Sequence, residues 1–181
     1  MIYVFTGNGK GKTTAAIGTA IRALGSGEKV LFIQFMKDET ITSETKILKK
    51  LENFTLKSVG RKGFYLPKEM LLKNPDLVKY GVKPIEEIDK QLAYEGLKFV
   101  KENIENNDLI VLDEVCIAIY FGLLKVEDVI DLLKSHSDKD FILTGRNCPQ
   151  ELLDMADLVT EMKEVKHPYQ KGIKAKKGLD Y

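Results

Sequence analysis

The amino-acid sequence predicts an α/β fold built on a mostly parallel, doubly wound sheet with helices on both faces. Residues 30–35 (VLFIQF) and 109–112 (LIVL) are continuous apolar runs, as expected for strands that are covered on both sides. Apolar residues at helical spacing lie between the first of these runs and an earlier one at residues 2–5. A chain of 181 residues suits one such domain and is short for two, so we expect a single domain over residues 1–181.

Residues 1–35 are predicted to form a strand, a glycine-rich loop, a helix and a second strand, which together make a βαβ unit. The first strand covers residues 2–5 and ends before Gly7. The helix ends at the sequence Gly25-Ser26-Gly27. Its expected core positions are Ile17, Ala20, Ile21 and Leu24.

The remaining elements are predicted with less regular patterns. Residues 37–83 hold one expected strand at 54–59 and are otherwise irregular, which is typical of a functional or mobile segment. Pro84 suits the first turn of a helix that reaches about residue 104. Strands are expected at residues 141–143 and 158–162, with a helix from Pro149 to about residue 155 between them. The core candidates of the long helix are Ile85, Ile88, Leu92, Leu97 and Val100.

Composition excludes several classes of protein. The formal net charge is only +1, which argues against a general nucleic-acid-binding protein. No apolar run approaches the roughly 18–20 residues of a membrane span, and no secretory signal opens the chain, so we expect a cytoplasmic protein. Cys116 and Cys148 belong to no C-x-x-C pair, which favours two reduced, buried thiols over a zinc site or a disulfide.

The stretch TGNGKGKTT is predicted to bind phosphate. It contains G-K-T in the order of a phosphate-binding loop (P-loop), although Thr6 stands where the usual pattern has its first glycine. Glycines at alternate positions allow consecutive backbone N–H groups to turn inward, and the following helix adds its positive end. The alternative is a glycine-rich turn with solvated lysines. The expected phosphate-binding residues are Gly7, Asn8, Gly9, Lys10, Gly11, Lys12, Thr13 and Thr14.

An acidic pair is predicted to serve a metal ion beside this loop. Asp113 and Glu114 directly follow the buried run LIVL, and Thr13 offers a hydroxyl group from the loop. Magnesium needs only one or two carboxylates when phosphate and water supply the other ligands. A solvated strand end, or a helix N-cap formed by Asp113, is the alternative.

Few other side chains are candidates for the chemistry. Arg146 follows a predicted strand and could reach a triphosphate, or else form a surface ion pair. The only other arginines are Arg22 and Arg61. His136 lies in a polar run and is expected to be solvated, and neither it nor His167 has a partner at metal-ligand spacing.

The chain resembles the ATP:corrinoid adenosyltransferases of cobalamin synthesis and salvage. The resemblance rests on the blocks FTGNGKGKTTAAIGTAIRALG, IQFMK, VLDEV, LTGRNCPQELLDMADLVTEM and VKHPYQKGIKAKKGLDY, which occur in the family's order from Met1 to Tyr181. The nine-residue loop, with its threonine, and the closing KH…G.KA..G.DY block are the most specific of these. Generic P-loop proteins share neither.

The resemblance implies a single P-loop (RecA-like) domain and an enzyme that transfers the 5′-deoxyadenosyl group of ATP to the Co(I) centre of a corrinoid. Inorganic triphosphate would leave, and Mg²⁺ (or Mn²⁺) would be the cofactor. By resemblance Thr13 and Glu114 serve the metal and Arg146 contacts phosphate. Together with the acidic pair, the expected metal ligands are Thr13, Asp113 and Glu114, and the expected catalytic residues are Lys12, Glu114 and Arg146. The family also implies a homodimer, and a flavoprotein-type reductant for cobalt is the expected partner.

The resemblance also implies an apolar wall for the corrin at residues 63–66. The family has a phenylalanine and a tryptophan there; Phe64 fits, whereas Leu66 takes the place of the tryptophan and the chain has no tryptophan at all. A dry wall of this kind would favour cobalt that has lost its lower axial ligand. The substitution therefore bears on how that ligand is displaced.

Two other functions remain open from the sequence. A P-loop small-molecule kinase, such as a nucleoside kinase, would produce ADP and a phosphorylated acceptor. A nucleotide-gated module or RecA-like motor subunit would use Arg146 across an interface. The scarcity of arginines counts against the kinase, and the near-neutral charge counts against a DNA-stimulated motor.

Overall fold

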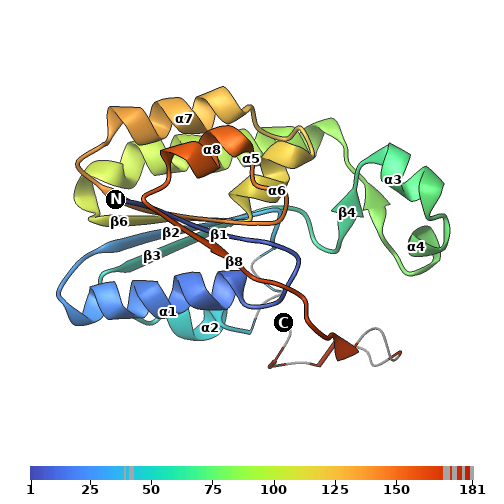
Figure 1. Ribbon diagram of the computed structural model, residues 1–181, viewed down its shortest axis with the longest axis horizontal. Helices are drawn as coiled ribbons and strands as arrows, with labels where there is room; N and C mark the ends of the chain where they lie inside the picture. The colour runs from blue at the N-terminus through green and yellow to red at the C-terminus, as the bar shows by residue number, and fades with distance from the viewer. Residues whose placement is uncertain (39, 41–42, 169–171, 173–174, 177, 180–181) are drawn as a thin grey trace.

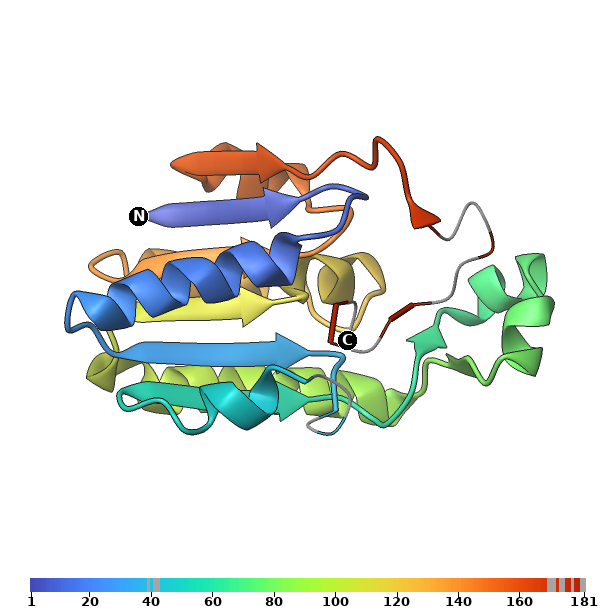
Figure 2. The same cartoon turned by 90° about the horizontal axis from the view of Figure 1, so that it is seen from below.

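Six parallel strands form the central sheet of the protein, in the spatial order β3-β2-β6-β7-β1-β8 (Figure 2). The computed structural model describes residues 1–38, 40, 43–168, 172, 175–176 and 178–179. Every predicted strand is confirmed to within one residue at each end. Because all six strands are parallel, their carboxyl ends meet at one edge of the sheet. The strands are β1 (Ile2–Thr6), β2 (Val30–Phe35), β3 (Phe54–Val59), β6 (Leu109–Asp113), β7 (Asp140–Thr144) and β8 (Leu158–Glu161).

Helices cover both faces of this sheet, which confirms the predicted fold class (Figure 1). One face carries α1 (Lys12–Gly25) and the short α2 (Thr45–Leu48). The opposite face carries α5 (Glu87–Asn103), α6 (Val115–Tyr120), α7 (Val126–Ser135) and α8 (Gln150–Met155), and a 3₁₀ turn, η1 (Ile104–Asn106), follows α5. Helices α6 and α7 are not among the elements predicted from the sequence. The predicted unit of β1, α1 and β2 is present, but β6 and β7 lie between its two strands.

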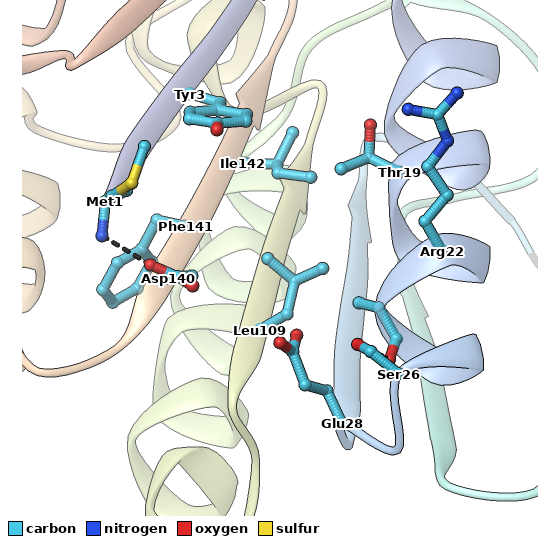
Figure 3. A pocket seen from close by; sticks show the side chains of 11 residues that line it. Met1, Tyr3, Thr19, Arg22, Ser26, Glu28, Leu109, Asp140, Phe141 and Ile142 are labelled. Atoms are coloured by element: carbon cyan, nitrogen blue, oxygen red, sulfur yellow. Dashed lines mark hydrogen bonds and ion pairs between the residues drawn. The ribbon is translucent and has the colours of Figure 1, made fainter.

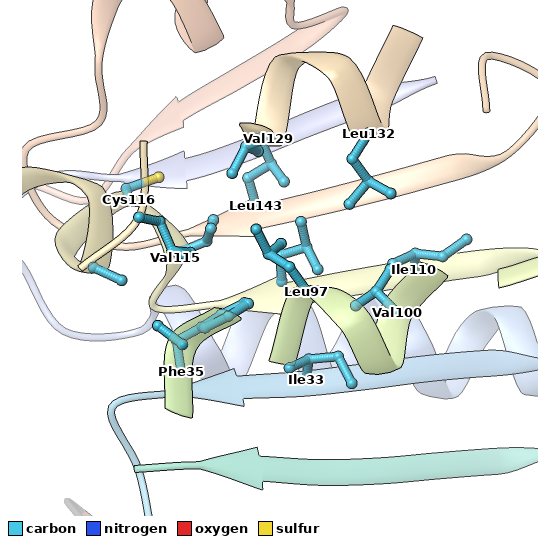
Figure 4. Close-up of a cluster of buried hydrophobic side chains, with 14 of the residues drawn as sticks. Ile33, Phe35, Leu97, Val100, Ile110, Val115, Cys116, Val129, Leu132 and Leu143 are labelled. Atoms are coloured by element: carbon cyan, nitrogen blue, oxygen red, sulfur yellow. The ribbon is translucent and has the colours of Figure 1, made fainter. Parts of the chain in front are cut away.

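The core lies on both sides of β2, whose six residues are all buried. Alternate side chains of a strand point to opposite faces. Phe32 therefore packs in the cluster with Ala16 and Ala20 of α1. Ile33 and Phe35 pack in the cluster below α5 and α7 (Figure 4).

Two predicted core positions are wrong. Ile21 is 50% exposed because α1 buries the small residues Ala16 and Ala20 against the sheet instead. Ile88 is 41% exposed, since α5 turns Ala93, Leu97 and Val100 inward. Small residues let a helix approach the sheet closely: a Cβ added at Gly96 would lie only 2.8 Å from Val59 and 2.9 Å from Phe35.

The long helix also starts later than predicted. Pro84 lies in a short strand, and α5 begins at Glu87. Glu86 and Asp89 form a capping box in which each side chain accepts a hydrogen bond from the other residue's backbone. This cap satisfies the N–H groups of Glu86 and Asp89, so it fixes the start of the helix in place of the proline.

Residues 60–84, here called the outer segment, extend beyond the carboxyl edge of the sheet (Figures 1 and 2). The sequence predicted an irregular region; the structure instead has the parallel pair β4 (Tyr65–Leu66) and β5 (Lys83–Pro84), with α3 (Lys68–Lys73) and α4 (Asp76–Lys79) between them. Arg61 anchors the segment through hydrogen bonds of 2.7 and 2.6 Å to Asp89. Its guanidinium also lies 2.9 Å from Glu86.

Candidate active site

The glycine loop joins β1 to α1 at the carboxyl edge of the sheet, and its three glycines serve different purposes. Gly7 and Gly11 adopt left-handed φ angles of 96° and 118°. Gly9 permits a close approach: its N–H donates to the Met162 carbonyl at 2.6 Å, and an added Cβ would lie 2.7 Å from that oxygen, while a Cβ added at Gly7 would lie 2.5 Å from it. Thr6, at the position of the missing first glycine, ends β1, and its carbonyl accepts the Met162 N–H at 2.8 Å. The loop is therefore fitted to the chain that follows β8.

Lys12, the first residue of α1, is only 8% exposed. Its Nζ donates to the carbonyls of Gly7 at 2.8 Å and Gly9 at 2.7 Å. Burial lowers the pKa of Lys12, and the nearby Glu114 carboxylate opposes this shift. The first turn of α1 carries no acidic residue, so no carboxylate of the helix itself neutralises its positive end.

Asp113, the last residue of β6, is the centre of the polar network beside the loop. Its side chain is completely buried. Its Oδ1 accepts hydrogen bonds from Thr13 Oγ1 at 2.9 Å and Thr144 Oγ1 at 2.7 Å, and its Oδ2 accepts one from Lys37 Nζ at 2.7 Å. The start of α1 and the carboxyl ends of β2, β6 and β7 therefore converge on one carboxylate.

Lys37 is the cation of this network, and the sequence interpretation gave it no role. Its Nζ also donates to Thr13 Oγ1 at 3.2 Å, and its side chain is 19% exposed. Burial alone would lower the pKa of Lys37, but the carboxylates of Asp113 and Glu114 outweigh burial, so the pKa is raised. The ammonium is thus held charged against Asp113.

The oxygens of Thr13 and Asp113 suit a divalent cation. The described residues contain no group of three or more His, Cys, Asp or Glu side chains arranged around a metal position. A hydroxyl and one carboxylate are nevertheless enough for Mg²⁺ or Mn²⁺ when phosphate and water complete the shell. The ammonium of Lys37 already contacts both oxygens, so this pair of groups binds a cation in the structure itself.

Glu114 occupies the junction between this network and an apolar cavity. Its backbone is left-handed, with φ 62°, and its N–H donates to Thr144 Oγ1 at 2.9 Å. This conformation is uncommon for a residue with a side chain, and it turns Glu114 out of the line of β6. Burial, and then the charge of Asp113, raises the pKa of the Glu114 carboxyl.

The cavity has a volume of about 360 Å³ and lies between the sheet edge and the outer segment. Phe64, 73% exposed, borders it together with Leu66. The structure therefore brings the predicted corrin wall and the predicted acidic residue Glu114 to one cavity, and Lys37 lines it too. The complete lining is Met36, Lys37, Gly63, Phe64, Tyr65, Leu66, Val82, Glu114 and Ile117.

Arg146 reaches the loop from the turn after β7. Its Nη2 donates to the carbonyl of Asn8 at 3.3 Å, and the side chain is exposed. The side chains of Asn8, Lys10 and Thr14 are exposed as well. The exposed residues of the predicted phosphate-binding set thus lie at the protein surface, with Arg146 in contact with the loop.

A second cavity lies at the opposite end of the sheet. It has a volume of about 250 Å³ and is bordered by Thr19, Arg22 and Glu28 from the α1 side and by Tyr3 and Ile142 from the strands (Figure 3). None of the predicted site residues lines it. The amino ends of the strands therefore have no part in the site proposed from the sequence.

The predictions for His136, the two cysteines and the closing block have different outcomes. His136 is half-buried at the end of α7, where its Nδ1 lies 3.0 Å from the Leu132 carbonyl, so the prediction of a solvated loop histidine is wrong. Cys116 is buried and Cys148 only half-buried, and both are free thiols, as predicted. The closing block of the family resemblance lies partly outside the described residues. In the part of the chain that the structure describes, no helix is long and apolar enough to cross a membrane.

Comparison with known proteins agrees with the geometry. The chain matches the family "ATP:corrinoid adenosyltransferase BtuR/CobO/CobP" over residues 1–181. It is 35% identical to corrinoid adenosyltransferase CobA of Salmonella typhimurium and 34% identical to the corrinoid adenosyltransferase of Escherichia coli K12, in each case over all of this chain and 85% of the relative. The corrinoid adenosyltransferase of Pseudomonas aeruginosa is 32% identical over all of this chain and 83% of its own. The resemblance predicted from the sequence is confirmed: this chain belongs to the ATP:corrinoid adenosyltransferase family, whose members are enzymes that adenosylate corrinoids.

Proposed function

We propose that residues 1–181 act as one nucleotide-binding domain that transfers the 5′-deoxyadenosyl group of ATP to the Co(I) centre of a corrinoid and releases inorganic triphosphate. One observation carries this proposal beyond family membership. The phosphate loop and the apolar cavity meet at Glu114, so two substrates of different polarity can lie side by side. In this proposal the triphosphate lies in the loop, and the corrin ring lies with one face against the cavity.

In the proposed reaction a bond forms between cobalt and C5′ while the bond from C5′ to the triphosphate oxygen breaks. The Co(I) electron pair supplies the new bond, cobalt becomes formally Co(III), and the electrons of the broken bond leave with the triphosphate. Negative charge therefore grows on the leaving group. Cationic and N–H groups along the whole triphosphate stabilise that charge better than groups gathered at the γ-phosphate.

The loop residues hold the leaving group in this proposal. Gly7, Asn8, Gly9, Lys10, Gly11 and Thr14 surround the triphosphate, and the Lys12 ammonium exchanges its two carbonyl partners for phosphate oxygens. Arg146, already at the rim of the loop, contacts the triphosphate from the other side. These cations would assist departure without any proton transfer.

Mg²⁺ (or Mn²⁺) would be held by Thr13 and Asp113, with Glu114 beside them. Bound there, it would neutralise part of the charge on the triphosphate. The support for this placement is the ammonium of Lys37, which occupies the same two oxygens. Glu114 is the residue through which the charged half of the site borders the corrin half.

Phe64 and Leu66 would form the wall against the corrin. An apolar surface offers no partner to a polar ligand on cobalt, so it favours the form of the corrinoid that has lost its lower ligand. Leu66 presents less surface than the tryptophan of the family pattern, which leaves Phe64 as the larger contact.

The chemistry also implies partners. Co(I) has to be supplied by a strong one-electron reductant, for which we propose a flavoprotein.

We also propose a homodimer. In support, β8 is an edge strand whose four residues are all exposed, including Leu158 and Val159. Sedimentation velocity would test the dimer.

The decisive experiment is to identify the phosphate product. The protein is mixed with ATP, Mg²⁺ and chemically reduced cobinamide, and the absorbance is followed for a light-sensitive adenosyl product. We expect that product together with inorganic triphosphate in equal amounts. ADP and a phosphorylated acceptor would instead support a kinase, and the absence of both triphosphate and adenosyl product would refute the proposal.

A further inference from the structure

We infer that Lys37 is a positioning residue that occupies the metal ligands of the nucleotide-free enzyme and yields them to a divalent cation only when a triphosphate binds. This inference rests on the proposed metal position at Thr13 and Asp113. It concerns a residue that the sequence interpretation passed over. It also predicts an order of events: a free divalent cation binds weakly, and a cation bound to ATP binds well.

The first support is the position of the ammonium. Lys37 Nζ lies 2.7 Å from Asp113 Oδ2 and 3.2 Å from Thr13 Oγ1. These are the side chains that would ligate Mg²⁺ or Mn²⁺. An ammonium and a hard divalent cation seek the same oxygen atoms, so the two compete for one place.

The second support is the burial of the carboxylate. Asp113 is completely buried, and a buried carboxylate without a cation is strongly destabilising. Lys37 supplies that cation when no metal is present. A divalent ion arriving without nucleotide would find the Lys37 ammonium already bound to the Asp113 oxygen that it needs. At short range in a partly buried site, the divalent ion and the ammonium would repel each other.

The third support is the tight packing of the backbone that carries Lys37. The preceding residue, Met36, has a left-handed backbone with φ 58°. A Cβ added at Gly60 would lie only 2.5 Å from the backbone nitrogen of Lys37. The base of the lysine is thus fixed, while its side chain borders the open cavity. The flexible four-carbon stem can carry the ammonium away without moving the strand.

A bound triphosphate resolves the competition because it brings several negative charges next to the same oxygens. Its oxygens can accept hydrogen bonds from the displaced ammonium and, at the same time, bind the divalent cation. Binding of metal and nucleotide then becomes cooperative. Lys37 would prevent free divalent cations from filling the site before the co-substrate does.

The test is the affinity of the nucleotide-free protein for Mn²⁺, measured from the electron paramagnetic resonance signal of the free ion. Lys37→Met is expected to bind Mn²⁺ at least tenfold more tightly than the wild type, whereas Lys37→Arg, which keeps a cation, is expected to stay weak. Lys37→Gln retains a hydrogen-bond donor for Asp113 and replaces Lys37→Met if the latter does not fold.

Two matched lysine variants separate displacement from a general loss of charge. Lys12→Met removes a cation that interacts with Asp113 through space, so a smaller gain in affinity is expected. Lys57→Met removes a lysine that lies over the Phe99 ring, and no change is expected. Equal Mn²⁺ affinity of the wild type, Lys37→Met and Lys37→Gln, or an equal gain in Lys12→Met and Lys37→Met, would overturn the inference.

The same proteins distinguish failure of this inference from failure of the proposed function. If the wild type makes adenosyl product and triphosphate while Lys37→Met and Lys37→Gln bind Mn²⁺ no more tightly, only the role of Lys37 is wrong. If the wild type makes neither product, the proposed function fails whatever the Mn²⁺ affinities are.

Discussion

The two halves of the candidate site are built in opposite ways. The phosphate half is centred on buried groups with fixed partners: Lys12 is 8% exposed, and Asp113 is fully buried. The corrin half presents open apolar surface, with Phe64 73% exposed on the outer segment. A small charged group is bound by donors at fixed distances, whereas a large apolar ring needs only area. Substitutions in the first half should therefore affect chemistry and folding together, and those in the second half should affect binding alone.

The largest effect is expected from Lys12→Met. It removes the ammonium that would bind the leaving triphosphate, so kcat should fall by about 10³-fold, the upper range for loss of one transition-state donor. It also leaves the carbonyls of Gly7 and Gly9 without this partner, so the free energy of unfolding should fall by about 1–3 kcal/mol. Turnover of reduced cobinamide and chemical denaturation measure the two effects.

The control for this prediction is Lys10→Met in the same loop. Its side chain is exposed, and a solvent-exposed ion pair contributes at most about 1 kcal/mol, so a loss of only about fivefold is expected. If kcat fell equally in Lys10→Met and Lys12→Met, the burial of Lys12 would not explain its effect on the reaction.

A smaller effect is expected from Gly9→Ala. The new Cβ would lie 2.7 Å from the Met162 carbonyl oxygen and 2.8 Å from the Lys163 backbone, so the loop or the chain after β8 has to shift. We expect a loss of about 1–3 kcal/mol in the free energy of unfolding and weaker ATP binding. Chemical denaturation and calorimetric titration with ATP would measure these changes.

Gly18→Ala is the matched control in α1, where nothing lies within 4 Å of an added Cβ. Alanine is the better helix former, so this variant should gain about 0.5–1 kcal/mol. A Gly9→Ala protein as stable as the wild type would contradict the tight fit of the loop.

The corrin half should respond differently. Phe64→Ala is expected to raise KM for the corrinoid about tenfold, because loss of ring contacts costs about 1–2 kcal/mol. KM for ATP should stay unchanged, and the free energy of unfolding should move by less than about 0.5 kcal/mol, as for other exposed side chains. Leu72→Ala on α3, 81% exposed and outside the cavity, should change none of these values. A parallel rise in both KM values would contradict the division of the site into two halves.

The sequence predicted the two halves unequally, for a physical reason. The phosphate loop and Asp113 could be found because glycine conformations, buried strands and strand-end carboxylates leave local patterns. Lys37 could have been found by the same rule, since it follows β2 as Asp113 ends β6. The shape of the outer segment could not, because it depends on Arg61 reaching Asp89 across 28 positions of the chain. The proposed wall at Phe64 and Leu66 came from family resemblance and not from any periodic pattern.

The smallest effect concerns the residue between those two side chains. Tyr65 is only 4% exposed although its neighbour Phe64 is open to solvent. Burial, and then the charge of Asp89, raises the pKa of Tyr65 to about 12 from an ordinary value of 10.0. Because the folded state holds the proton more tightly than the unfolded state, the stabilisation from Tyr65 is complete below pH 10 and is lost as the pH rises through 12.

Replacing Tyr65 by phenylalanine should therefore make the free energy of unfolding fall less steeply between pH 10 and 12. Denaturation with urea at a series of alkaline pH values measures this slope. Tyr80→Phe in the same segment, where the ring is 84% exposed, is the control and should keep the slope of the wild type. The same slope in Tyr65→Phe and the wild type would contradict the raised pKa of Tyr65 in the folded protein. A flatter slope for Tyr65→Phe alone would show that the open corrin half, like the phosphate half, contains a buried group whose protonation is linked to folding.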